Sequence, residues 1–339
     1  MARSNPNLSL RTAPAEPQVP TTRETAAIVG SIPPRKRQIG QSDLIVFPLA
    51  LSGNVFGWKT DDAAANEILD TYAAQGGDFL DTADSYAGGR SEIMIGNWMR
   101  ARRNRSDIVV ATKVGKSSEN PGLRARVLTR AVHASLQRLG TDHIDLLYLH
   151  IDDESVDFDE TLLAVDELIR AGTVRYFGAS DHSGNRLIEA RIASAQLGVA
   201  PMVALQQRYN LLDRNGYEGD LARVAQHQGL GVMPRFALAS GFLSGKYRSK
   251  SDIPATERGV DAGRYLNKRG LRVLASLDSI AALHDTSVAS VAIAWLLTQP
   301  RIVAPVVSAS RPDQVLDLTA GPSLQLSRHQ VAELDRVSS

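Results

Sequence analysis

Cysteine is absent from the 339-residue sequence. Its absence excludes disulfides, thiolate zinc sites, iron–sulfur clusters and a cysteine nucleophile, and it favours a reducing compartment. An excess of charge of one sign is also lacking, because 38 basic side chains face 37 acidic ones. Such a balance is not typical of a protein whose main partner is a polyanion, so we expect no nucleic-acid ligand.

Long apolar runs are missing as well. No stretch approaches the roughly 18 consecutive apolar residues of a membrane-spanning helix, and the amino terminus lacks the apolar segment of an export signal. These absences predict no membrane partner and a cytoplasmic location. Hydrophobic residues make up 43% of the chain and charged residues 22%, which is typical of a globular protein with a full core. The sequence carries no signal for a particular oligomeric state.

Residues 1–38 differ in composition from the rest of the chain. Six of the 15 prolines fall there, together with more basic than acidic side chains. Such a segment buries little apolar area, so the entropy of an unfixed backbone dominates. We predict a flexible extension over residues 1–38 and one folded domain over residues 39–339.

In the folded domain, short β-branched runs alternate with amphipathic stretches at intervals of about thirty residues, the size of a βαβ unit. Eight such units predict a parallel (β/α)8 barrel of the TIM type, with a doubly wound open sheet as the alternative. A long insertion should separate the last two strands and contain helices over residues 271–284 and 288–298. The predicted strands cover residues 45–51, 78–81, 108–112, 144–149, 174–178, 202–205, 231–233 and 302–307.

Polar residues follow these runs at the carboxyl ends of the strands, where a barrel carries its chemistry. Asp81 ends the second run and Tyr86 comes after it, while Lys113 and His150 directly follow the third and fourth. Each has an ordinary structural explanation alone, but together they can shift proton affinities. We expect Lys113 to lower the pKa of Tyr86 and Asp81 to keep Lys113 charged. His150 would hold a substrate carbonyl beside the Tyr86 hydroxyl.

This set can protonate an oxygen, but it contains no redox group, so a hydride would have to come from a cofactor. The same residues allow an alternative, a Schiff-base aldolase with Lys113 as the nucleophile. A metal hydrolase is not favoured, because the seven histidines include no His-x-His pair, and we predict no metal.

Four segments in order, DTADSY at 81–86, ATKVG at 111–115, LYLH at 147–150 and GTVRYFGAS at 172–180, resemble the aldo-keto reductases. The likeness extends from about residue 37 to 337. GNVFGW at 53–58 and QQRYNLLD at 206–213 are similar to the branch of bacterial oxidoreductases and potassium-channel β-subunits. The resemblance implies NADPH-dependent reduction of an aldehyde or ketone, with Asp81, Tyr86, Lys113 and His150 as the catalytic residues. A cofactor-sensing partner subunit with slow turnover is the alternative that it implies.

The resemblance also implies which residues bind NADPH. Ser180 and Gln206 would hold the nicotinamide carboxamide, the loop over residues 238–247 would bind the pyrophosphate, and Arg311 would bind the 2′-phosphate. Trp58 and Ile151 would line the substrate pocket. The expected cofactor residues are Gly53, Asn54, Ser180, Asp181, Gln206, Arg235, Leu238, Ser240, Gly241, Lys246, Ser310, Arg311, Gln314 and Asp317.

Two of these positions depart from the family pattern. Asp181 stands where asparagine is frequent, and Arg235 stands where an aromatic residue usually stacks on the nicotinamide. A guanidinium can stack on a ring, and its charge would disfavour the oxidised nicotinamide, which is cationic, so the resemblance leads us to expect a bias toward reduced cofactor. An equally weighted alternative is that Arg235 forms a salt bridge or reaches a phosphate.

Overall fold

The computed structural model describes residues 34–339, so most of the predicted extension over residues 1–38 lies outside the described residues. The described end of that segment belongs to the folded unit that begins at Pro34. Strand β1 (Arg37–Gln38) pairs antiparallel with β2 (Ile45–Val46). The Arg37 guanidinium donates hydrogen bonds to the carbonyl oxygens of Ile302 and Leu297, at 2.7 and 2.9 Å.

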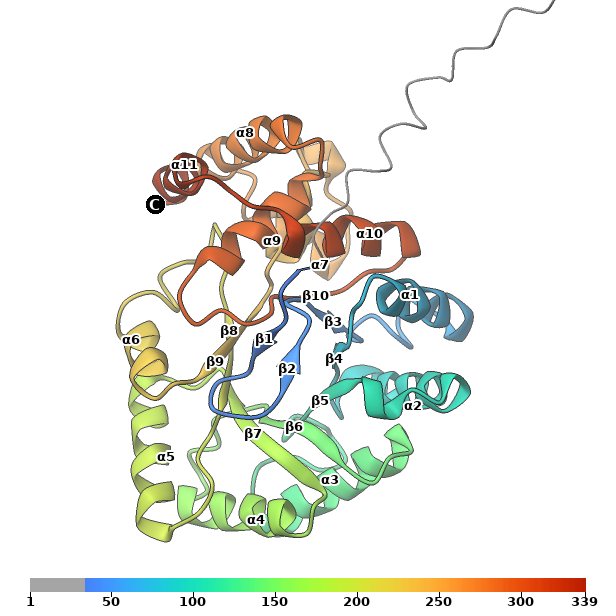
Figure 1. The fold of residues 1–339 in the computed structure, drawn as a ribbon, viewed down its shortest axis with the longest axis vertical. Helices are drawn as coiled ribbons and strands as arrows, with labels where there is room; N and C mark the ends of the chain where they lie inside the picture. Colours follow the sequence, from blue (N-terminus) through green and yellow to red (C-terminus); the bar gives the residue numbers. More distant parts are fainter. Residues whose placement is uncertain (1–33) are drawn as a thin grey trace, which may run out of the picture. The chain divides into compact units, whose positions relative to one another are not determined.

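Eight further strands in residues 34–339 form one parallel sheet in the order β10-β3-β4-β5-β6-β7-β8-β9. A bridge between Val232 and Ile302 joins β9 to the segment before β10, so the sheet is a nearly closed barrel (Figure 1). The predicted TIM barrel is confirmed over the doubly wound alternative. The strands are β3 (Ala50–Ser52), β4 (Phe79–Asp81), β5 (Val109–Val114), β6 (Ile144–Leu149), β7 (Val174–Ser180), β8 (Ala204–Arg208), β9 (Gly231–Arg235) and β10 (Val306–Val307).

The first and last predicted strands are shorter in the structure. The predicted run over residues 45–51 is divided, because its first residues pair with β1 and only its end enters the barrel as β3. The run over residues 302–307 forms a single bridge and then β10. Apolar β-branched residues predict extended backbone in both places, but the pairing partners depend on chain segments far apart in sequence.

One helix follows each of the strands β3 to β8 and covers the outside of the barrel (Figure 1). Each helix buries one apolar face; α3, for example, buries Leu128, Val132 and Leu139 and ends at Gly140, whose φ of 63° suits a residue without a side chain. These helices are α1 (Asp62–Ala74), α2 (Arg90–Arg102), α3 (Ala125–Leu139), α4 (Phe158–Arg170), α5 (Gly184–Leu197) and α6 (Asp220–His227).

The predicted long insertion lies between β9 and β10 and contains both predicted helices. Two more helices follow β10. Short 3₁₀ turns cover Tyr86–Gly89, Arg105–Asp107, Ala239–Ser244, Lys250–Asp252 and Gly321–Ser323. The remaining helices are α7 (Glu257–Gly263), α8 (Lys268–Leu283), α9 (Val288–Thr298), α10 (Pro312–Ala320) and α11 (Arg328–Ser338).

No single helix in residues 34–339 has the length and composition to cross a membrane. Helices α8 and α9 pass that test only as a pair, and they are bent by 99° relative to each other.

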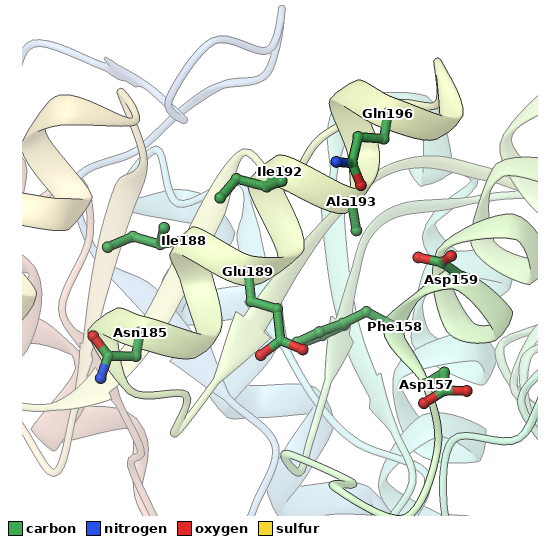
Figure 2. Close-up of a pocket in the computed structure, with 9 residues that line it drawn as sticks. All are labelled: Asp157, Phe158, Asp159, Asn185, Ile188, Glu189, Ile192, Ala193 and Gln196. Carbon is green, nitrogen blue, oxygen red and sulfur yellow. The ribbon is translucent and has the colours of Figure 1, made fainter.

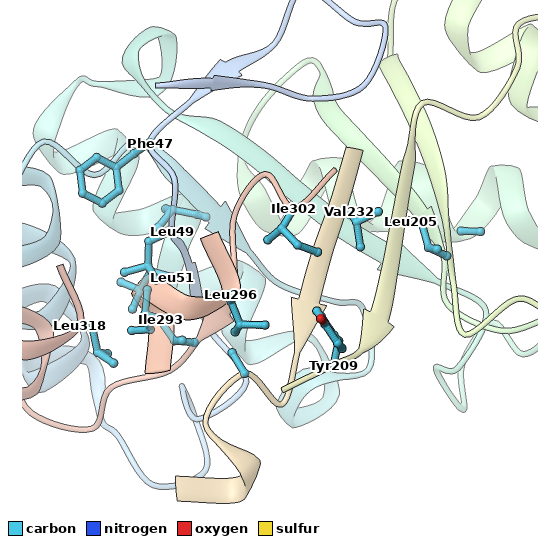
Figure 3. Packing of buried hydrophobic residues seen from close by; sticks show 14 of the residues in the cluster. Phe47, Leu49, Leu51, Leu205, Tyr209, Val232, Ile293, Leu296, Ile302 and Leu318 are labelled. Carbon is cyan, nitrogen blue, oxygen red and sulfur yellow. The ribbon is translucent and has the colours of Figure 1, made fainter. Parts of the chain in front are cut away.

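The apolar core has two layers. One layer lies inside the barrel, where Phe79, Leu146 and Met233 meet Ile39 and Val46 from the β1–β2 hairpin. The other lies between the strands and the helices, and Figure 3 shows part of it around Leu49, Leu51, Ile293, Leu296 and Leu318. The hairpin fills one end of the barrel, because a Cβ on its Gly40 would lie 2.1 Å from the carbonyl oxygen of Val203, just before β8. Functional side chains therefore have room at the opposite end of the barrel, at the carboxyl ends of the strands.

Candidate functional site

The predicted catalytic residues lie together at the carboxyl ends of neighbouring strands. Asp81 is the last residue of β4, and Lys113 is the penultimate residue of β5. His150 directly follows β6, and Tyr86 begins the 3₁₀ turn after β4. Consecutive parallel strands therefore bring these groups to one edge of the barrel.

Lys113 and Asp81 form a buried ion pair. The Lys113 ammonium donates to Asp81 Oδ2 at 2.7 Å and to the carbonyl oxygen of Thr82 at 2.8 Å. The other Asp81 oxygen accepts a hydrogen bond from Gln206 Nε2 at 2.8 Å. Burial lowers the pKa of Lys113, but its contacts with Asp81 and Tyr86 raise that pKa above its ordinary value on balance. The ammonium therefore stays charged, as expected.

The Tyr86 phenol lies beside this ion pair. Its oxygen is 3.5 Å from the Lys113 ammonium nitrogen, which is 5.0 Å from the centre of the Tyr86 ring. Burial raises the pKa of Tyr86, and Lys113 lowers it by less, so the net direction is upward. Lys113 does lower the pKa, as expected, but a pKa below the ordinary value does not result, because burial outweighs Lys113 and the Asp81 carboxylate adds to the rise. At neutral pH the phenol holds its proton.

His150 completes the group as a neutral imidazole. Its ring lies edge-on to the Tyr86 ring, with centroids 6.2 Å apart. Burial, and then the charges of Lys113, Lys116 and Arg235, lower the pKa of His150 to about 2. Nδ1 is buried and has no hydrogen-bond partner among the described residues. A neutral ring can donate one hydrogen bond to an oxygen without adding a charge.

Tyr86 and His150 border a cavity of about 670 Å³ at the strand ends, while Asp81 and Lys113 are buried and do not line it. The other predicted residues that do not line it are Gly53, Ile151, Gly241, Lys246, Ser310, Arg311, Gln314 and Asp317. Ten predicted residues line it: Asn54, Trp58, Tyr86, His150, Ser180, Asp181, Gln206, Arg235, Leu238 and Ser240.

A second hollow, of about 570 Å³, lies on the outside of the barrel along α5 and the start of α4 (Figure 2). Ile188, Ile192 and Glu189 of α5 border it, with Phe158 of α4 behind. None of the predicted site residues lies there. Because the proton-transfer groups border the other cavity, we take the cavity at the strand ends as the candidate active site.

The two residues that depart from the family pattern contact each other. Arg235 Nη2 donates to both carboxylate oxygens of Asp181, each at 2.7 Å, and Arg235 Nε donates to Oδ1 at 3.0 Å. Of the roles left open for Arg235, the structure shows the salt bridge. Lys116 approaches the same carboxylate, with its nitrogen 4.0 Å from Asp181 Oδ2. Asp181 is therefore shared between two cations.

The turn after β9 lies beside two cations. Ala239, Ser240 and Gly241 have φ values of 49°, 56° and 95°. The N–H groups of Ala239 and Gly241 donate to the carbonyl oxygens of Phe236 and Leu238, both at 2.8 Å, so an anion here would depend on the nearby cations. Lys246 folds over the turn, since a Cβ on Gly241 would lie 3.2 Å from its ammonium nitrogen. Arg258 of α7 reaches the Ser240 carbonyl oxygen at 3.4 Å. These residues fit a phosphate group of a dinucleotide cofactor.

The start of α10 carries the other expected phosphate residues. Gln314 Oε1 accepts hydrogen bonds from the N–H and hydroxyl of Ser310. The exposed Arg311 guanidinium donates to both oxygens of Asp313, at 2.9 and 2.8 Å. Asp317 lies one turn further along the helix, where burial raises its pKa. A cofactor phosphate at this position would compete with Asp313 for Arg311.

Several residues that line the cavity are not predicted from the sequence. Lys116 could have been found by the same rule as Lys113, because it closely follows the end of β5. Glu257, Arg258 and Asp261 come from α7 in the long insertion, and nothing in the sequence shows that this helix returns over the strand ends.

A family model described as "Aldo/keto reductase family" matches residues 49–339. An aryl-alcohol dehydrogenase of Pestalotiopsis microspora is 31% identical over 86% of this chain and 78% of its own length. A probable voltage-gated potassium channel β subunit of Oryza sativa is 32% identical over 83% of this chain and 89% of its own. An uncharacterized oxidoreductase of Bacillus subtilis is 30% identical over 88% and 94%.

Asp84 is a further buried acid beside the site, on the segment that carries Tyr86. It is 2% exposed, and neither carboxyl oxygen meets hydrogen-bond geometry with a partner in residues 34–339. Burial, together with the Glu92 carboxylate, raises the pKa of Asp84 to about 7, although Arg138 opposes the shift. Its backbone N–H donates to the Lys113 carbonyl oxygen at 3.0 Å, which ties the Tyr86 segment to β5.

The raised pKa of Asp84 makes the free energy of unfolding depend on pH. Between about pH 4 and 7 the folded chain holds a proton that the unfolded chain releases, so stability falls as pH rises through that window. Asp84→Asn stays neutral, so its stability relative to the original protein should rise from pH 5 to pH 8 by about 2 kcal/mol. Urea unfolding at both pH values measures this, with the exposed Asp107→Asn as control. An equal difference at pH 5 and pH 8 would contradict the assignment.

Proposed function

The chain belongs to the aldo/keto reductase family, and from that premise we propose that it reduces an aldehyde or ketone to an alcohol with NADPH as the hydride donor. Family members generally use a nicotinamide cofactor. One observation carries the proposal: the Tyr86 hydroxyl, at the border of a cavity, lies 3.5 Å from a lysine that a buried carboxylate keeps charged. A protonated phenol next to a fixed cation is suited to giving a proton to a developing alkoxide.

Each residue has a part in this reaction. The neutral His150 donates a hydrogen bond to the substrate oxygen and keeps it near the phenol. Tyr86 gives its proton to that oxygen as negative charge develops there, and Lys113 stabilises the phenolate that is left. Asp81 holds Lys113 in place and charged. When bound, the reduced nicotinamide supplies the hydride that forms the new C–H bond at the carbonyl carbon.

The Schiff-base aldolase alternative is disfavoured by the state of Lys113. Its side chain is 0% exposed and its ammonium is bonded to Asp81. A Schiff-base lysine must be neutral to attack a carbonyl, but the pKa of Lys113 is raised by Asp81 and Tyr86 against the effect of burial. The charged amine can assist Tyr86, but it has no free lone pair for the substrate.

We assign the cofactor by the same reasoning. Ser180 and Gln206 would bind the nicotinamide end, because both border the cavity beside the catalytic group. The turn at Ala239–Ser244 with Lys246 would bind the pyrophosphate, and Arg311 at the start of α10 would bind the 2′-phosphate. The other proposed cofactor contacts are Gly53, Asn54, Asp181, Arg235, Leu238, Ser310, Gln314 and Asp317.

A role as a cofactor-sensing subunit is a second candidate, because relatives named as channel β subunits match most of this chain. The two candidates differ in turnover. A reductase should consume NADPH with simple aldehydes at rates above about 1 s⁻¹, the lower end of typical enzymes, whereas a sensor should turn over far more slowly. For either role, the cysteine-free composition supports a reducing compartment, and we propose the cytoplasm.

Replacing the proposed acid tests the reductase mechanism. Tyr86→Phe should lower kcat by about 10²- to 10⁴-fold, because the proton donor is lost while the ring and its packing stay. Steady-state NADPH oxidation across a panel of aldehydes and ketones measures the effect. The affinity for NADPH and the melting temperature serve as controls and should stay near those of the original protein. A kcat within threefold of the original would exclude Tyr86 as the acid.

The Asp181–Arg235 pair should set the preference between oxidised and reduced cofactor. Arg235→Phe removes the cation and leaves the Asp181 carboxylate, so affinity for NADP⁺, whose nicotinamide ring is cationic, should rise about two- to fivefold relative to NADPH. In the double variant with Asp181→Asn the ratio should return toward its original value. Fluorescence titration with both cofactor forms measures the ratios. An unchanged ratio in Arg235→Phe would place this pair away from the nicotinamide.

Arg311 should distinguish NADPH from NADH. Arg311→Ala should weaken NADPH binding about tenfold and NADH binding by much less, because only NADPH carries the 2′-phosphate. Asp313→Asn is the matched opposite change: it frees the guanidinium, so NADPH affinity should increase. Dissociation constants for both cofactors measure the two effects. Equal losses for NADPH and NADH in Arg311→Ala would remove the assignment.

A further inference from the structure

The active-site cavity is bordered by cations that have no part in the proposed reaction, and Lys116 is one of them. Lys116 follows the end of β5 and borders the same cavity as Tyr86 and His150. Its side chain is 41% exposed, so the ammonium group is accessible from the cavity. A cation at that place would act on whatever substrate lies against the phenol and the imidazole.

The charge of Lys116 is only partly balanced. Its nearest carboxylate oxygen, Asp181 Oδ2, is 4.0 Å away. Both oxygens of Asp181 already accept short hydrogen bonds from Arg235. One carboxylate therefore serves two cations, and about one positive charge is left over on this wall. By contrast, Lys113 is the only cation that forms a salt bridge with Asp81 among the described residues.

The excess charge reaches the reacting end of the cavity. Lys116 and Arg235 both contribute to the low pKa of His150, after burial and Lys113. Burial also lowers the pKa of Lys116 itself, so its ammonium is partly stripped of water. An anionic partner stabilises a partly dehydrated ammonium more strongly than it stabilises a fully hydrated one.

The cofactor has other cations available for its phosphates. Lys246 and Arg258 lie at the turn after β9, and Arg311 lies at the start of α10, whereas Lys116 belongs to the segment after β5. The cavity also presents exposed aromatic surface, with Trp58 73% exposed. The lining of the cavity thus combines the flat apolar face of Trp58 with the incompletely neutralised ammonium of Lys116.

We propose that Lys116 binds an anionic substituent of the substrate, so that the protein prefers aromatic carbonyl compounds that carry a carboxylate over their neutral counterparts. The inference rests on the proposed carbonyl reduction and narrows its substrate class. The carboxylate pairs with the Lys116 ammonium while the carbonyl oxygen lies between Tyr86 and His150. No new chemical step is needed, because the carboxylate is unchanged by the reaction.

Matched substrates separate charge from shape. The 3- and 4-carboxybenzaldehydes are compared with their methyl esters, which keep the ring and the aldehyde but lose the charge. The ratio of kcat/KM for acid over ester should exceed about fivefold for the better isomer. In Lys116→Met the ratio should fall to about one, and in Lys116→Arg it should stay above one. Lys250→Met removes the same charge at an exposed site outside the cavity, and its ratio should not change.

Each outcome decides the proposal. A ratio near one in the original protein, or a ratio that is the same in Lys116→Met, overturns it, provided that melting temperatures show the variant is folded. A higher KM for NADPH in Lys116→Met with an unchanged acid-to-ester ratio would identify Lys116 as a cofactor contact and would also overturn it. If the protein reduces no aldehyde, the proposed function is wrong, and the substrate ratio does not measure the role of Lys116. Calorimetric binding of benzoate against benzamide in the same variants then decides the role of Lys116.

Discussion

The buried ion pair between Lys113 and Asp81 is the interaction on which the site depends. Removing an ammonium and a carboxylate from water costs several kcal/mol for each ion, and good geometry with further hydrogen bonds must offset it. Here the Thr82 carbonyl oxygen and the Gln206 amide provide those bonds. Because each partner is held from more than one side, the ammonium nitrogen has a fixed place, and the Tyr86 oxygen lies next to it.

That pair is possible because of the strand register in the barrel. Asp81 pairs with Ala111 in β5, two residues before Lys113, so the two side chains come from adjacent strands at the same edge. Lys113 in turn pairs with Tyr148 of β6, two residues before His150. Side chains two apart on a strand point to the same face. A shift of one residue in either pairing would turn a member of the set away from the cavity.

The sequence predicts what depends on short-range pattern. Eight β-branched runs predict the strands, and the rule that chemistry follows a strand end finds Asp81, Lys113 and His150 together. It does not predict interactions between distant segments: the split of the first strand by the hairpin, the return of α7 over the cavity, and the contact of Arg235 with Asp181, 54 residues apart. The direction of the Tyr86 pKa is missed for the same reason, because burial depends on the assembled fold.

The raised pKa of Tyr86 is compatible with the acid role that we propose for it, because the charge on the site differs before and after proton transfer. With no negative charge on a substrate oxygen, burial and Asp81 both favour the protonated phenol, which keeps the proton in place until it is needed. When charge develops on an oxygen beside the phenol, the proton can move to it, and the phenolate that remains faces the Lys113 ammonium. The Lys113 ammonium therefore stabilises the Tyr86 phenolate more than it stabilises the neutral phenol. Because part of that charge has already moved in the transition state, an interaction that strengthens as the charge moves lowers the barrier.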